Sequence, residues 1–212
     1  MFSGDGATQA VLDNLWLVIA GCLVFLMQAG FAFVEAGLTR AKNIANIMAK
    51  NLADMAIGVV MFFIVGYSIA FGDGGDLWGG LGDFLFLDSA DPDVLNEGGG
   101  LTDNLTPAVS FFFQVVFAAT AVTIASGAMA ERTKFTTYLI FSAVMCAVIY
   151  PVVVHWTWGG GLIAQISIGD AVYSDFAGST VVHLTGAVAA LVGAWMIGPR
   201  LGKYGPGGEP RA

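Results

Sequence analysis

Residues 174–198 read SDFAGSTVVHLTGAVAALVGAWMIG. About 23 of these residues carry no charge, and at about 1.5 Å of rise per residue they can cross the roughly 30 Å hydrocarbon core of a bilayer. His183 follows Asp175 by eight residues, so a helix places it about 12 Å from Asp175, inside the membrane. An ionisable side chain is costly there. The stretch therefore predicts a membrane-spanning helix that carries a functional histidine.

The composition of the whole chain agrees with this prediction. Of its 212 residues, 57% are hydrophobic and 11% are charged, and the mean hydropathy is +0.77. Soluble domains carry about 25% charged residues. The 29 glycines suit close helix packing in lipid. These features predict an all-α, polytopic membrane protein.

Several other classes of protein are disfavoured by the sequence. It contains no Walker loop and no CxxC, GxSxG or HExxH motif, so we expect no enzymatic activity and no cofactor or metal. The pI of about 4.4 disfavours nucleic-acid binding. We interpret the two cysteines as small packed residues rather than a disulfide; they are Cys22 and Cys146.

The apolar runs predict five transmembrane helices, at about residues 12–37, 44–71, 107–130, 135–155 and 176–198. They form one unit over residues 1–202, and residues 203–212 begin a linker or tail. Thr106 and Pro107 are the N-cap and first residue of the third helix. In the second helix, Lys50 and Asp54 are spaced to form an ion pair. The short apolar piece at 84–87 is expected to touch the membrane surface.

The charged residues divide between the two ends of these helices. Lysine and arginine follow the first, third and fifth helices, whereas most acidic residues lie before the first and after the second and fourth. The positive-inside rule makes the basic side cytoplasmic. We therefore expect a multi-pass protein of the cell membrane with its N-terminus outside and its C-terminus in the cytoplasm. We expect the first helix to act as its own insertion signal, because residues 1–14 have no basic segment of the kind that opens a cleavable leader.

Each candidate site residue has a structural reading beside its functional one. His183 either donates a hydrogen bond to a neighbouring helix or lines a pore as a proton relay; a metal site is disfavoured. Asp175 either caps the fifth helix or attracts a small cation by its charge. Trp158 precedes three glycines, so its indole face is open to a cation, or it belongs to an interfacial belt. Phe113 and Phe117 share a helix face and either pack or form a gate.

An odd number of helices has a topological consequence. A second unit of five would enter the membrane in the opposite orientation, which is the inverted-repeat design of many transporters. We therefore expect that this chain is the first half of such a protein.

Four motifs resemble the ammonium transporter family (the Amt/Mep/Rh superfamily), in family order, over residues 12–202. They are FVEAGLTRAKN at 33–43, GAMAERTKF at 127–135, WGGGLIA at 158–164, and DFAGSTVVHLTGAVAALVGAWMIGPR at 175–200. The resemblance implies an eleven-helix fold of two inverted five-helix halves plus one helix. It also implies homotrimers with a pore in each subunit, which conduct ammonium or methylammonium. This chain matches the first half.

The same resemblance implies a role for each candidate residue. Trp158 helps to recruit ammonium by a cation–π contact, and Asp175 supports that site through structure and field. Phe113 lines the vestibule, and Phe117 is one of two gating phenylalanines. His183 is the first of two histidines in a hydrophobic, channel-like conduit. Ammonium can release its proton there while the dry pore excludes other ions.

Three functions follow as alternatives. The chain is part of an ammonium transporter, or of an ammonium sensor in which the same fold is joined to a signalling module, or it is a five-helix packing subunit. The family also implies a PII-type regulatory partner on the cytoplasmic face. The second gating phenylalanine, the recruitment-site serine and the second histidine of the family are not in this sequence, so this chain alone should not conduct.

Overall fold

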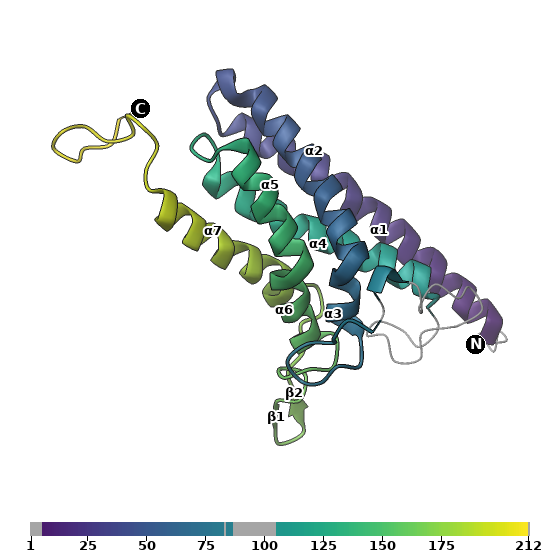
Figure 1. Cartoon of the computed structure of the whole chain (residues 1–212). Coiled ribbons are helices and arrows are strands. Elements are labelled where there is room, and N and C mark those ends of the chain that lie inside the picture. The colour runs from purple at the N-terminus through teal and green to yellow at the C-terminus, as the bar shows by residue number, and fades with distance from the viewer. Residues whose placement is uncertain (1–5, 83, 87–104, 212) are drawn as a thin grey trace.

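The computed structural model describes residues 6–82, 84–86 and 105–211, and Figure 1 shows their arrangement as a bundle of long helices. Five helical segments are long and apolar enough to cross a membrane, which confirms the predicted all-α, polytopic class. The elements in chain order are α1 (Gly6–Gly37), η1 (Ala41–Asn43), α2 (Ile44–Met61), η2 (Phe62–Gly66), α3 (Tyr67–Phe71), η3 (Phe84–Phe86), α4 (Pro107–Met129), α5 (Phe135–Val144), η4 (Met145–Ile149), α6 (Tyr150–Thr157), β1 (Ser167–Ile168), β2 (Ala171–Val172), η5 (Ser179–Leu184) and α7 (Thr185–Ile197).

The second, fourth and fifth spans each contain a π-helical turn, in η2, η4 and η5. In the fourth span the cause lies in Pro151, which has no N–H to donate to the carbonyl one turn earlier. The turn η4 directly precedes α6, the helix that contains this proline, and it widens the helix without interrupting it. The fourth span therefore remains continuous from Phe135 to Thr157.

The helix α4 is the centre of the bundle. It packs against α1, α2 and α7, and it is the most buried of the five spans. Small residues allow the close approach to α4: a Cβ on Gly58 of α2 would lie 3.5 Å from Ala119 Cα, and one on Gly186 of α7 would lie 2.8 Å from the carbonyl oxygen of Ala121. The glycine content thus serves helix packing, as the composition predicts.

The start of α4 agrees with the prediction in position but not in chemistry. Thr106 is the N-cap residue and Pro107 the first helical residue. However, the Thr106 hydroxyl makes no capping bond and donates instead to Asn14 Oδ1 on α1, at 3.0 Å. The residue therefore ties α4 to α1.

Two other expectations are wrong, and a third stays a prediction. Lys50 pairs with Glu35 of α1, at 2.9 Å, and not with Asp54. The contact of the piece at 84–87 with the membrane surface stays a prediction: Phe84 is exposed, whereas Phe86 is buried and packs against Tyr67, with ring centroids 5.0 Å apart. Leu87, in the same predicted piece, lies outside the described residues. Cys22 is exposed on α1, and only Cys146 is packed inside; both are free thiols.

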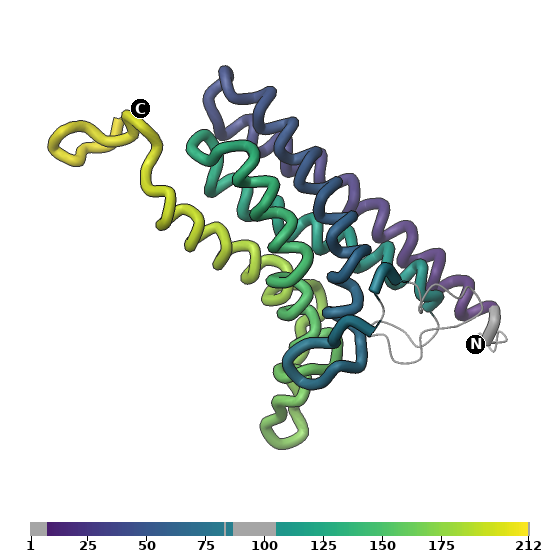
Figure 2. Tube along the Cα trace, in the orientation of Figure 1, coloured from purple at the N-terminus to yellow at the C-terminus, as the bar shows by residue number. Residues whose placement is uncertain are grey.

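The two ends of the bundle differ in charge. We call the end that carries Arg40, Lys42, Arg132, Lys134 and Arg200 the basic end, and the end that carries Asp73, Asp76, Asp170 and Asp175 the acidic end. The tube in Figure 2 follows α1 from its start near the chain's N-terminus to the opposite end of the bundle, where the segment after α7 also lies. The predicted acidic residues between 88 and 103 lie outside the described residues.

Glu131, in the loop after α4, links this loop to the segment between α1 and α2 and to the segment after α7, at the basic end. Its carboxylate accepts hydrogen bonds from the Arg40 side chain at 2.8 Å, from Asn43, and from Arg200, which follows α7. The bond from Arg40 is the largest influence on the carboxyl and, with Arg200 and Asn43, lowers its pKa from 4.5 to about 2, although burial acts the other way. Glu131 therefore fixes the ends of α1, α4 and α7 relative to one another.

We expect Glu131→Gln to lower the free energy of unfolding by about 1 kcal/mol at neutral pH, because the neutral amide loses a network of charged partners. The folded state holds the pKa below its ordinary value, so this stabilisation is present above about pH 4.5. It disappears as the pH falls through 2. Thermal unfolding of the wild type and of Glu131→Gln at pH 7 and at pH 2 measures both effects.

A matched control is Glu209→Gln. The Glu209 carboxylate lies 3.8 Å from Arg211 in an exposed pair, and such pairs contribute little. An equal loss in both variants would contradict the assigned role of Glu131.

Candidate functional site

Three of the predicted site residues meet at the acidic end of α4. Phe113 and Phe117 lie one turn apart on this helix, and their ring centroids are 5.0 Å apart in an edge-to-face arrangement. Trp158, directly after α6, has its ring centroid 6.4 Å from that of Phe117. All three side chains are only half-buried. They form an edge-to-face aromatic cluster with partly exposed ring surface, and such a surface can bind a small cation.

Asp175 lies in the turn before η5 and is saturated with hydrogen bonds. Its Oδ1 accepts the backbone N–H groups of Gly178 and Ser179, each at 2.9 Å. Its Oδ2 accepts the N–H groups of Thr180 and Val181, at 2.8 and 2.9 Å, and the Thr180 hydroxyl at 2.7 Å. The carboxylate thus caps the fifth span, which begins at Ser179 rather than near residue 176.

The cap also explains the charge state of Asp175. Burial alone would raise the pKa of its carboxyl, but the donors from Val181, Thr180 and Gly178 outweigh it and lower the pKa from 3.8 to about 2. Gly178 adopts a φ of +87°, which bends the chain so that these N–H groups converge. All five donors point at the carboxylate, so both of its oxygens are occupied by hydrogen bonds within this turn.

Asp175 also holds the aromatic cluster. Its backbone carbonyl accepts the indole N–H of Trp158 at 2.7 Å. This bond holds the indole ring in its orientation beside Phe117. The cap of the fifth span and the aromatic cluster are therefore parts of one assembly.

His183 lies in the π-helical turn η5, one to two turns beyond the cap. Its backbone N–H bonds to the carbonyl of Gly178 at 3.0 Å, five residues earlier. The side chain is exposed, and within the described part of the chain its ring has no hydrogen-bond partner. This does not support the reading of a histidine tied to a neighbouring helix. π-Helical turns are frequent at functional sites. The sequence pattern predicted a helix here but not this π-helical turn.

His155 is a residue whose role sequence reasoning missed. It is buried, and its ring nitrogens lie 3.0 Å from the carbonyl oxygen of Ala70 and 2.6 Å from that of Gly75. The backbones of Gly159 and Gly161 pack against it so closely that a Cβ on either would approach within 2.8 Å of its ring atoms. The glycines after Trp158 have no side chains and therefore leave room for His155. The hydrogen bonds of His155 tie the Trp158 segment to the end of α3 and the loop after it.

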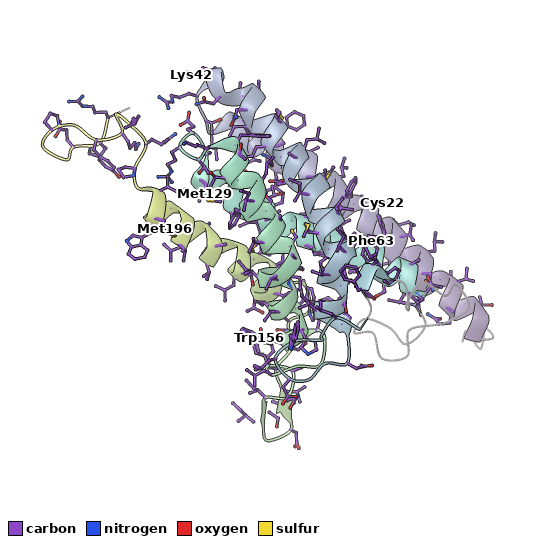
Figure 3. All side chains as sticks on the ribbon, viewed as in Figure 1. Cys22, Lys42, Phe63, Met129, Trp156 and Met196 are labelled. Carbon is purple, nitrogen blue, oxygen red and sulfur yellow. The ribbon has the colours of Figure 1, made fainter. Side chains whose placement is uncertain are left out.

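The neighbouring Trp156 has a structural role. Its indole N–H donates to the carbonyl oxygen of Leu77 at 3.0 Å, in the same loop that His155 fastens. Figure 3 shows Trp156 near the acidic end of the bundle, as expected for a membrane-interface tryptophan.

One side of the site is uncovered. The helix α7 exposes a row of apolar side chains, among them Leu191 (69% exposed) and Trp195 (82%), and α1 exposes Trp16 (72%). In Figure 3, Met196 points away from the bundle. His183 is exposed on this same span.

No group of three or more histidine, cysteine, aspartate or glutamate side chains in the described ranges is arranged to hold a metal.

Comparison with known proteins gives a consistent result. The profile of the Ammonium Transporter Family matches residues 15–212. Ammonium transporter Amt2 of Archaeoglobus fulgidus is 46% identical over 207 residues, which cover 95% of this chain and 42% of that protein.

Solved structures agree with this relationship. A structure described as "Sensor Amt Protein" is 37% identical with a TM-score of 0.84, covering 97% of this chain and 49% of that one. Mep2 of Candida albicans is 27% identical with a TM-score of 0.76, covering 89% and 39%. The chain thus spans less than half the length of these relatives.

Proposed function

Because this chain belongs to the ammonium transporter family, we propose that it forms the first half of a transmembrane pathway for ammonium and methylammonium. The helices described above, residues 1–202 in the proposed division, form this half, and residues 203–212 begin a linker or tail. The proposal gives the protein a transport function and no enzymatic one. It is supported most directly by the joined arrangement of Trp158, Asp175 and Phe117 above His183.

The proposed path runs from the acidic end to the basic end. A cation is first attracted by the acidic end and binds against the indole face of Trp158, with Phe113 and Phe117 below it. Asp175 holds the indole and adds a negative charge nearby. Beyond the phenylalanines the path is apolar, so an ion that keeps its charge is rejected. Ammonium can deprotonate, and His183 is placed to pass its proton along while ammonia continues.

The second half of the fold would cover the exposed faces of α1 and α7. An inverted unit of five helices would bring a second gate and a second histidine opposite His183. The trimer and the PII-type cytoplasmic partner remain part of this proposal. So does the orientation, with the N-terminus outside and the basic end in the cytoplasm.

A complete transporter tests the proposed function directly. We would replace the matching segment of A. fulgidus Amt2 with this chain and express the chimera in cells that lack ammonium uptake. We expect labelled methylammonium to enter well above the level of cells with an empty vector, with unmodified Amt2 as the positive control. A chimera that reaches the membrane folded and yet gives no uptake would contradict the proposal.

The sensor is the second candidate function, favoured by the similarity to the sensor structure. It predicts that the complete protein binds methylammonium and transports little of it. It also predicts a cytoplasmic signalling module after the second half of the fold. Binding without uptake in the chimera, whose second half comes from a transporter, would point to a sensor-type first half.

A further inference from the structure

A cluster of ionisable side chains inside the bundle has no part in the proposed pathway. Glu35 comes from α1, Lys50 and Asp54 from α2, and Tyr138 from α5. Their exposed fractions are 7%, 3%, 0% and 0%. Buried charges within membrane-spanning helices are costly, so each needs a partner or a function.

Glu35 and Lys50 neutralise each other. Lys50 Nζ lies 2.9 Å from Glu35 Oε1 and also donates to the carbonyl oxygen of Ser126 at 3.0 Å. The Glu35 carboxylate receives further hydrogen bonds from Asn51 at 2.7 Å and from the Ser126 hydroxyl at 2.8 Å. The pair is therefore neutral overall and well hydrogen-bonded.

Asp54 has no cation of its own among the described residues. Tyr138 donates its hydroxyl to Asp54 Oδ2 at 2.6 Å, and the Thr123 hydroxyl lies 3.4 Å from Oδ1. Both donors are neutral, and Lys50, one turn away, is bonded to Glu35. A fully buried carboxylate with no cation of its own costs several kcal/mol, and a proton removes this cost.

Thr123 links Asp54 to the basic end. Its hydroxyl oxygen lies within reach of Gln28 Oε1 at 2.9 Å and of the Ala119 carbonyl oxygen at 3.0 Å, besides Asp54. One hydroxyl proton serves one acceptor, so a proton on Asp54 Oδ1 would supply a further bond, donated to Thr123. Thr123 also lines a cavity of about 470 Å³ between α1, α4 and the segment after α7, together with Glu35, Arg132 and Arg200.

We propose that Asp54 is a proton-binding site inside the membrane, which exchanges its proton with the basic end through Thr123 and this cavity. The titratable groups that face it are Glu35 from α1, Lys50 from its own helix, Tyr138 from α5 and the neutral thiol of Cys146 from η4, while α4 contributes no ionisable residue. Protonation removes one negative charge from the interface of α2, α4 and α5. The packing of these helices is thereby linked to the pH at the basic end.

Infrared spectroscopy of the full-length protein in lipid, titrated between about pH 5 and 9, tests the proposal. We expect the carbonyl band of a protonated carboxyl group that disappears as the pH rises, and we expect Asp54→Asn to abolish it. The matched control Asp76→Asn, in the exposed loop after α3, should keep the band. No such band in the wild type, or a band that survives in Asp54→Asn, would overturn the proposal.

Two further variants keep the test decisive if Asp54→Asn does not fold. Tyr138→Phe keeps the carboxyl and removes its hydroxyl donor, so the band should persist at an altered frequency and up to a higher pH. Glu35→Gln frees Lys50 to pair with Asp54, so the band should appear only at lower pH. A band that is unchanged in both variants would assign the proton to another group. Since the readout is protonation, it is independent of the transport assay.

Discussion

Replacing His183 by alanine in the complete transporter should reduce methylammonium uptake by about tenfold or more, because a positioned proton acceptor contributes at least this much to a proton-transfer step. The imidazole is exposed on η5, with no hydrogen-bond partner in the described part of the chain, so its loss should disturb the packing of this half very little. Uptake of labelled methylammonium and the accompanying current, measured with and without potassium, give both rate and selectivity.

Trp195→Ala is a suitable control for this experiment. It removes a larger side chain, 82% exposed, from the same span about three turns away. If His183→Ala leaves both the uptake and the selectivity over potassium unchanged, the packing-subunit alternative is favoured and the pore role of His183 is wrong. If Trp195→Ala gives the same loss, the effect reports assembly with the second half rather than proton transfer.

Asp175→Asn should have the second large effect, on stability and uptake together. The carboxylate accepts five hydrogen bonds, whereas an amide offers one acceptor oxygen and turns an NH₂ group toward the other N–H donors. We expect a loss of about 3 kcal/mol in the free energy of unfolding, since bonds to a charged acceptor contribute about 1.5 to 3 kcal/mol each and some persist. Uptake should fall as well, because the carbonyl that holds Trp158 moves.

The pH dependence of this cap has a defined sign. The folded state holds the pKa of Asp175 at about 2, below its ordinary value of 3.8. The stabilisation is therefore complete above about pH 4 and disappears as the pH falls through 2. Thermal unfolding between pH 2 and pH 7 should show this loss in the wild type and not in Asp175→Asn.

Asp170→Asn is the matched control for the cap. Asp170 is an exposed aspartate in the β1–β2 turn at the same end of the bundle. If both variants lose equal stability and uptake, the acidic end acts through its total charge, and the specific capping role of Asp175 is wrong.

Much of the fold follows from local sequence properties. Apolar length predicts all five spans, because a helix in lipid must satisfy its own backbone, whatever its neighbours are. The start of the third span at Pro107 follows from the fixed φ of proline. The partners of Lys50 and Thr106 did not follow, because Glu35 and Asn14 come from another helix. Spacing within one helix suggested Asp54 and an N-cap bond instead.

The sequence by itself determined the number of helices, the division of charge between the two ends and the identity of the candidate site residues, because these depend on hydropathy and residue type. The tertiary structure decided how those residues act. Only the packed chain brings the carbonyl of Asp175 to the Trp158 indole. It also leaves Asp54 without a cation of its own in the part of the chain that the structure describes. Only the packed chain places His183 on an uncovered face. Such contacts join residues that are far apart in sequence, and they depend on how α4 orients the helices around it.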